Sequence, residues 1–137
     1  MERGEVVDGC FWIDRRLHRS AAIDVYRAVD VRDSSPINVR IYSSVSTGGV
    51  DHFQRVCRGL ASSPHAALER VVGWGSLPRG ALYPATRALS GPTLDEVLAS
   101  NTPIADVTSI AGRLLEALAH LHSLGVAHGD LTARSAL

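Results

Sequence analysis

The sequence predicts an α+β domain, in which a five-stranded antiparallel sheet with one inserted helix is followed by further helices. Three observations predict this class. Apolar and polar side chains alternate along short segments of the first two thirds of the chain, which is the period of half-buried strands. Residues 50–62, within that region, have helical spacing instead. The longest apolar pattern, from Ile104 to Leu121, also repeats at helical spacing and lies close to the C-terminus.

Five segments are rich in β-branched, aromatic or alternating apolar residues and are bounded by turn residues, so each is predicted to be a strand. They are Phe11–Leu17, Ala22–Val29, Ile37–Tyr42, Leu68–Trp74 and Ala81–Thr86. The cluster Asp33–Pro36 is a turn sequence, and Gly75–Gly80 is expected to connect the last two strands. Residues 1–9 are expected to form a flexible lead.

The first helix is expected over residues 50–62, where apolar residues recur at helical spacing and Ser63-Pro64 ends the pattern. A short second helix should begin at Thr93 and run through Ala99. Thr93 and Glu96 have the spacing of a capping box, in which each side chain bonds the backbone N–H of the other residue.

The third helix has the clearest signals at its two ends. Thr102 is expected to cap it, Pro103 to occupy its first position and Gly125 to end it. Eight apolar residues are predicted to line one of its faces: Ile104, Val107, Ile110, Ala111, Leu114, Leu115, Leu118 and Leu121.

Composition excludes several functional classes. The chain has 137 residues, a formal net charge of zero and 45% hydrophobic residues, as expected for one modest globular domain. A balanced charge gives no reason to expect nucleic-acid binding. Because no apolar run approaches the roughly 18 residues of a membrane span, we expect no membrane association and a cytoplasmic location. Cys10 and Cys57 have no metal-ligand or disulfide spacing and are expected to be reduced.

Three segments, in this order, resemble protein kinases of the bacterial serine/threonine type. Val25–Asp30 resembles their second strand, Ser90–Leu94 resembles the segment after the hinge, and Leu114–Leu131 resembles the helix that leads into the catalytic loop. The resemblance implies a kinase-like N-lobe over residues 10–87. Residues 88–137 would then hold the hinge, the first C-lobe helices and the catalytic-loop segment of an incomplete C-lobe.

The catalytic residues that the resemblance implies lie in the last ten positions. Asp130 corresponds to the aspartate that orients and deprotonates the acceptor hydroxyl, and His128 to the preceding loop histidine. Arg134 corresponds to the arginine of the tyrosine-kinase variant of this loop. Ser135 takes the place of the asparagine that binds magnesium, and a single hydroxyl is a weaker ligand for that ion. The chain has no Asp-Phe-Gly sequence.

The nucleotide-binding residues are also altered. The resemblance places Arg40 where kinases carry the third-strand lysine, and Val56 where the helix carries its glutamate partner. We therefore expect Arg40 to lack that ion pair and to be solvated or loosely phosphate-facing. Asp51 is the acidic residue considered able to neutralise it in part.

The resemblance also implies a glycine-rich loop between the first two of the predicted strands. The three glycine positions of that loop hold His18, Ser20 and Ile23. Ser20, Val25, Arg40 and Thr86 are the residues predicted to contact a bound nucleotide. Binding of ATP and Mg²⁺ is expected to be weak or absent.

Three functions remain open at this point. The first is a catalytically impaired, pseudokinase-type module that binds a protein partner or, weakly, a nucleotide. The second is the front half of an active serine/threonine or tyrosine protein kinase, and the third is a small-molecule phosphotransferase of the aminoglycoside or choline kinase type. A partner protein or a missing C-lobe is expected to pack on the helix Ile104–Leu121. A histidine metal site and a serine hydrolase are disfavoured, since neither has its ligand or nucleophile pattern.

Overall fold

The computed structural model describes residues 1–43, 47–100, 103–128, 131–133 and 136. It divides into two compact units, one comprising residues 1–64 and 69–88, the other residues 65–68 and 89–137. Within these units the α+β class predicted from the sequence is confirmed. The domain bounds expected from the sequence, 10–87 and 88–137, stay a prediction.

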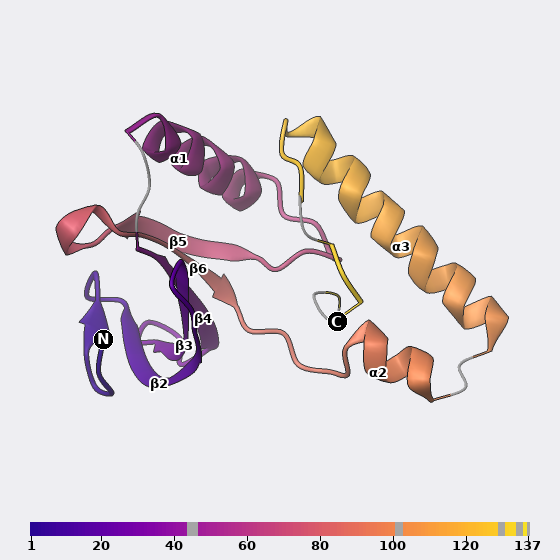
Figure 1. The fold of residues 1–137 in the computed structure, drawn as a ribbon, viewed down its shortest axis with the longest axis horizontal. Coiled ribbons are helices and arrows are strands. Elements are labelled where there is room, and N and C mark those ends of the chain that lie inside the picture. The colour runs from indigo at the N-terminus through magenta and orange to yellow at the C-terminus, as the bar shows by residue number, and fades with distance from the viewer. Residues whose placement is uncertain (44–46, 101–102, 129–130, 134–135, 137) are drawn as a thin grey trace. The chain divides into compact units, whose positions relative to one another are not determined.

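The first unit contains a curled antiparallel sheet in the strand order β1-β2-β3-β4-β6-β5 (Figure 1). Its strands are β1 (Val6–Val7), β2 (Phe11–Arg19), β3 (Ile23–Asp30), β4 (Pro36–Tyr42), β5 (Val71–Ser76) and β6 (Leu82–Arg87). A short 3₁₀ turn, Pro78–Gly80, connects β5 to β6. The five longer strands correspond to the predicted ones, with ends that differ by up to three residues.

The sixth strand, β1, lies inside the segment that was expected to be a flexible lead. Val6 and Val7 pair with Trp12 and Phe11 of β2, and the Val7 residue is only 2% exposed. The Tyr83 hydroxyl also donates a hydrogen bond to the carboxylate of Asp8. Pairing with the neighbouring strand β2, burial of Val7 and the bond from Tyr83 therefore order a segment that was expected to be flexible.

The two faces of the sheet differ in chemistry. One face carries the hydrophobic core, whose buried members are Val7, Phe11, Ile13, Tyr26, Ala28, Ile37, Val39, Tyr83 and Ala85. Because successive side chains of a strand point to opposite faces, Asn38, Arg40 and Thr86 lie on the other face. The backbone register pairs Asn38 with Thr86, and Arg40 with Val25. Adjacent strands thus bring three of the predicted nucleotide-binding residues, Val25, Arg40 and Thr86, to one face of the sheet.

Helix α1 (Thr47–Ser62) packs against β5 (Figure 1). Its predicted core residue Cys57 is 4% exposed, and burial raises the pKa of the Cys57 thiol to about 11. A buried thiol with so high a pKa stays protonated at neutral pH, so it behaves as a small apolar side chain. The helix begins three residues before the predicted start.

The second unit contains α2 (Leu94–Ala99) and α3 (Ile104–Ser123). The predicted capping box of α2 is confirmed. The Thr93 N–H donates to Glu96 Oε2 at 2.8 Å, and the Glu96 N–H donates to Thr93 Oγ1 at 3.3 Å. The ring of His65, in the segment 65–68, lies against the ring of His120 on α3, with 5.1 Å between their centroids.

The ends of α3 agree with the sequence in part. Gly125 has a φ of +70°, and the Val126 N–H donates to the Leu121 carbonyl at 2.9 Å, which is the backbone arrangement that ends a helix at glycine. Pro103 occupies the cap position and not the first helical position that was predicted. Thr102, the predicted cap, lies outside the described residues.

The predicted apolar face of α3 is covered only in part. Leu121 is 6% exposed, whereas Leu115 is 66% and Ile104 is 85% exposed. Eleven residues separate Ile104 from Leu115, which is close to three full turns, so the two side chains project on the same side. The second unit therefore covers only part of the apolar side of α3, and the part that carries Ile104 and Leu115 is exposed.

Candidate functional site

Arg40 is the centre of a three-residue polar network that joins β4, β6 and the residue two positions before β5. Its Nη1 and Nη2 atoms donate to Glu69 Oε2 at 2.6 Å and to Glu69 Oε1 at 3.1 Å, in a bidentate ion pair. Nη1 also donates to Thr86 Oγ1 at 3.0 Å. The Thr86 hydroxyl donates in turn to Glu69 Oε2 at 2.8 Å, and this bond closes a ring of three groups.

This network is partly removed from solvent. The exposed fractions of the Arg40 and Glu69 side chains are 31% and 24%, and Thr86 is 5% exposed. Burial lowers the pKa of the Arg40 guanidinium, but the hydrogen bonds and charge of Glu69 offset this, and the pKa stays above its usual value. Arg40 is therefore a permanently charged side chain in a fixed orientation. The expectation that Arg40 is solvated or loosely phosphate-facing did not include this ion pair, which holds the side chain.

The expected neutralising group for Arg40 is also corrected. Asp51 is exposed and makes no ion pair with any described residue. Val56, which the resemblance places at the position of the kinase glutamate, carries no carboxylate. The carboxylate that pairs with Arg40 is Glu69, which is 29 positions away in the chain and belongs to no helix.

The sequence does not single out Glu69, because this residue lies in the apolar run Leu68–Trp74 that is predicted to be a strand. One signal was available: a single carboxylate in a largely apolar run is costly to bury unless it has a partner. That signal does not indicate which cation lies opposite Glu69. The strand pairing identifies it: Thr86 of β6 pairs with Val71 of β5 on one side and with Asn38 of β4 on the other. Glu69 is therefore brought close to Arg40 of β4.

The hairpin between β2 and β3 stands where the glycine-rich loop was expected. The Ser20 hydroxyl accepts a hydrogen bond from the Ile23 N–H at 3.0 Å and donates to the Ile23 carbonyl at 2.9 Å. None of His18, Ser20 and Ile23 has a positive φ. The hairpin thus satisfies its own polar groups, and the predicted contact of Ser20 with a nucleotide has no support in its geometry.

Asn38 adds a polar group to the same face as Arg40. It lies beside Thr86 in the register of β4 and β6, and its Oδ1 atom is buried with no hydrogen-bond partner among the described residues. Val25 is adjacent to Arg40 on β3. The face around Arg40 therefore combines a fixed cation, an unpaired amide oxygen and an aliphatic side chain.

The predicted catalytic loop is described only in part. His128 is exposed, whereas Asp130, Arg134 and Ser135 lie outside the described residues. Two backbone carbonyls of this segment bond the first turn of α2: the Leu94 N–H donates to Ala136 at 2.9 Å and the Asp95 N–H donates to Ala133 at 3.1 Å. These bonds satisfy two amides that the start of a helix leaves without an intrahelical partner.

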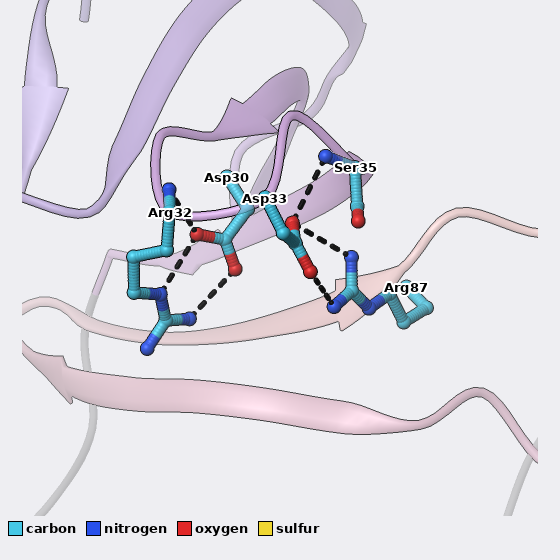
Figure 2. A network of polar contacts seen from close by, with 5 residues as sticks. All are labelled: Asp30, Arg32, Asp33, Ser35 and Arg87. Carbon is cyan, nitrogen blue, oxygen red and sulfur yellow. Dashed lines mark hydrogen bonds and ion pairs between the residues drawn. The ribbon is translucent and has the colours of Figure 1, made fainter.

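A second polar network lies at the turn between β3 and β4 (Figure 2). Arg32 Nε and Nη2 donate to the two carboxylate oxygens of Asp30 at 2.8 and 2.7 Å, while Arg87 at the end of β6 pairs with Asp33. The Asp30 side chain is 2% exposed, and its hydrogen bonds to Arg32 hold its pKa below the usual value despite burial. This network fastens the end of β6 to the neighbouring turn.

The described residues hold no group of three or more His, Cys, Asp or Glu side chains placed to bind a metal ion. Among them there is also no helix with the length and apolar character needed to cross a membrane.

Comparison with known proteins agrees with this geometry. No protein-family model matches the sequence. Serine/threonine-protein kinase pkn3 from Myxococcus xanthus is 31% identical over 84 residues, which are 60% of this chain and 15% of that protein. A crystal structure of the Mycobacterium tuberculosis PknI kinase domain matches with a TM-score of 0.79 and 20% identity, over 98% of this chain and 55% of that one. The chain has the protein-kinase fold.

A second crystal structure of the PknI kinase domain gives a TM-score of 0.78 and covers 56% of that chain. The predicted resemblance to bacterial serine/threonine kinases is thus confirmed, as is the predicted fold: a kinase N-lobe followed by the first C-lobe helices. The chain spans about half the length of these kinase domains and a smaller share of the curated relative.

Proposed function

We propose that this kinase-fold chain is catalytically impaired and acts as a pseudokinase-type binding or regulatory module. The observation that carries the proposal is the state of Arg40. Its terminal guanidinium edge is occupied by Glu69 and Thr86, so that edge is not free for nucleotide phosphates. The self-satisfied hairpin at Ser20 supports the same conclusion.

ATP and magnesium are the ligands that the kinase fold implies, and the residues present fit them poorly. Phosphoryl transfer depends on metal ions that neutralise the developing charge. Ser135 stands where the resemblance places the magnesium-binding asparagine, and a single hydroxyl is a weaker ligand for that ion than an amide carbonyl. No catalytic step through magnesium is proposed for this chain.

A thermal-shift measurement on the full chain tests this proposal. A ligand that binds only the folded state raises the melting temperature, and at a given ligand concentration the rise is larger for tighter binding. We expect ATP with Mg²⁺ to cause no chelator-sensitive rise in the melting temperature. We also expect no transfer of labelled phosphate from ATP. Asp130→Asn is the matched variant and should behave like the parent chain. A chelator-sensitive shift or a transfer activity that Asp130→Asn abolishes would overturn the proposal.

The second candidate is the front half of an active protein kinase. It is favoured by the extent of the match, since the chain covers 55% of the PknI kinase domain. Reading the coding sequence beyond Leu137 tests it. An Asp-Phe-Gly about twenty residues further on would supply the missing metal carboxylate. The small-molecule phosphotransferase would require a thermal shift with an aminoglycoside or choline.

We also propose that the exposed aliphatic side of α3 packs against protein, either further kinase C-lobe or a partner chain. Ile104 and Leu115 are large, apolar and exposed on one side of the helix. A stripe of this kind is unusual on a soluble surface and marks a site of protein contact. The composition of the chain predicts that it binds neither nucleic acid nor membrane, and a cytoplasmic location is likewise a prediction.

A further inference from the structure

The polar ring of Arg40, Glu69 and Thr86 has a consequence for how this site is held. In active protein kinases the third-strand lysine is oriented by a glutamate on the adjacent helix, and the pair forms only when that helix is in place. We propose that Glu69 is the positioning residue for Arg40, and that it makes the orientation of Arg40 independent of helix α1.

The geometry of the pair supports a positioning role. Glu69 uses both carboxylate oxygens, at 2.6 and 3.1 Å, on the edge formed by the two terminal nitrogens of Arg40. Such a planar two-point contact fixes the rotation of the guanidinium as well as its position. Thr86 adds a third point, because its hydroxyl bonds both Arg40 and Glu69.

The sheet, not the helix, sets the place of Glu69. Two positions after it, Val71 pairs with Thr86 in the β5–β6 ladder, and the Arg87 N–H donates to the Arg70 carbonyl at 2.9 Å. Arg40 itself lies in β4, whose Asn38 also pairs with Thr86. Arg40 and Thr86 therefore lie on adjacent strands of one sheet, and Glu69 lies next to a residue bonded to that sheet, so a shift of α1 would leave their separation unchanged.

Helix α1 has no group that could do the same. Its one carboxylate is Asp51, which is exposed and has no ion pair among the described residues. Val56 stands where the kinase glutamate is expected. An aliphatic side chain at that position cannot orient a cation, so the helix contributes packing alone.

The ring also leaves one part of Arg40 free. The guanidinium presents two edges, and Glu69 occupies the terminal one. The other edge is formed by Nε–H and one hydrogen of Nη2, and it has no acceptor among the described residues. The Arg40 side chain is 31% exposed. A lysine ammonium has no second pair of parallel N–H donors of this kind. Glu69 and Thr86 thus anchor arginine at position 40 through its terminal edge alone.

Side-chain NMR of the full chain without nucleotide tests the inference. With labelled arginine, we expect rotation about the Cζ–Nη bonds of Arg40 to be at least about tenfold slower than for the exposed Arg15, because charge-assisted hydrogen bonds oppose it. Arg40→Lys identifies the signal. Glu69→Gln should remove the slowing, whereas the matched variant Val56→Ala should retain it.

Two results would overturn the inference: slow rotation that persists in Glu69→Gln, or slow rotation that is lost in Val56→Ala. If Glu69→Gln does not fold, Glu69→Asp replaces it. Its shorter carboxylate should reduce the slowing, and an unchanged rate would count against Glu69. Since no nucleotide is present, the outcome is independent of the ATP measurements that test the proposed loss of catalysis.

Discussion

At the scale of single residues, the chemistry of this chain is set by which charges are paired in the folded state. The sequence alone does not show the ion-pair partners of Arg40 and Asp30. In the structure Arg40 is partly buried against Glu69, and Asp30 is almost wholly buried against Arg32. A partly desolvated ion pair is more sensitive to loss of one partner than an exposed pair, which contributes little.

Asp30 gives a prediction about pH. Its folded-state pKa is lowered, chiefly by the hydrogen bonds from Arg32. A lowered pKa means that Asp30 stabilises the folded chain above the ordinary value of about 3.9, and that this contribution is lost as the pH falls through the folded-state pKa. Asp30→Asn should therefore cost about 1–3 kcal/mol at pH 7, and progressively less as the pH is lowered below 4.

Urea denaturation at pH 7, 4 and 3 measures this difference. Asp14→Asn is the control, because its contact with Arg3 is long, at 3.6 Å, and the Arg3 side chain is 76% exposed. The control should change stability by less than about 0.5 kcal/mol. An Asp30→Asn cost that is equal at all three pH values would contradict the prediction.

At the scale of elements, close packing decides which glycines can change. A Cβ on Gly73 of β5 would lie 2.7 Å from the Phe11 ring, which is buried in the core. A Cβ on Gly112 of α3 would have nothing within 4 Å. The same substitution is thus expected to have opposite effects in the two elements.

Gly73→Ala should destabilise the chain by about 1–3 kcal/mol, because the core has no room for another methyl group. Gly112→Ala should stabilise α3 by about 0.5–1 kcal/mol, since alanine loses less backbone entropy in a helix. Tryptophan fluorescence, from Trp12 and Trp74 in the first unit, and circular dichroism of the helices would follow urea unfolding of each variant. A neutral or stabilising Gly73→Ala would show that the packing around Phe11 is looser than described.

At the scale of the whole molecule, the uneven cover of α3 connects the fold to its proposed role. The helix has apolar residues around a wide arc, but the structure covers only one side of that arc. We expect Leu115→Ala to change the free energy of unfolding by less than about 0.5 kcal/mol, because its side chain is 66% exposed. Leu121→Ala, at 6% exposure, should cost about 2–5 kcal/mol.

Thermal and urea unfolding of the two leucine variants, measured side by side, would test this difference. A large loss of stability in Leu115→Ala would mean that this side chain is already buried in the chain alone. The proposal that α3 receives further protein on that side would then fail.

The sequence by itself determined the local elements of this protein. Strand-like composition, apolar runs and, in Ile37–Tyr42, alternation predicted the five longer strands. The Thr93–Glu96 spacing predicted the capping box, and Gly125 predicted the end of α3. Each of these depends on residues within a few positions of one another, where backbone geometry limits the choices. The ordered motifs around Val25, Gly91 and Asp130 also indicated the kinase fold.

Only the tertiary structure decided which distant groups meet. The pairing of Arg40 with Glu69 joins positions 29 residues apart, and it follows from the placement of β6 between β4 and β5. The segment that holds β1 likewise has a distant contact, since Asp8 accepts a hydrogen bond from Tyr83, which is 75 positions away. Contacts of this kind have no local period, because they arise from strand order and shared burial.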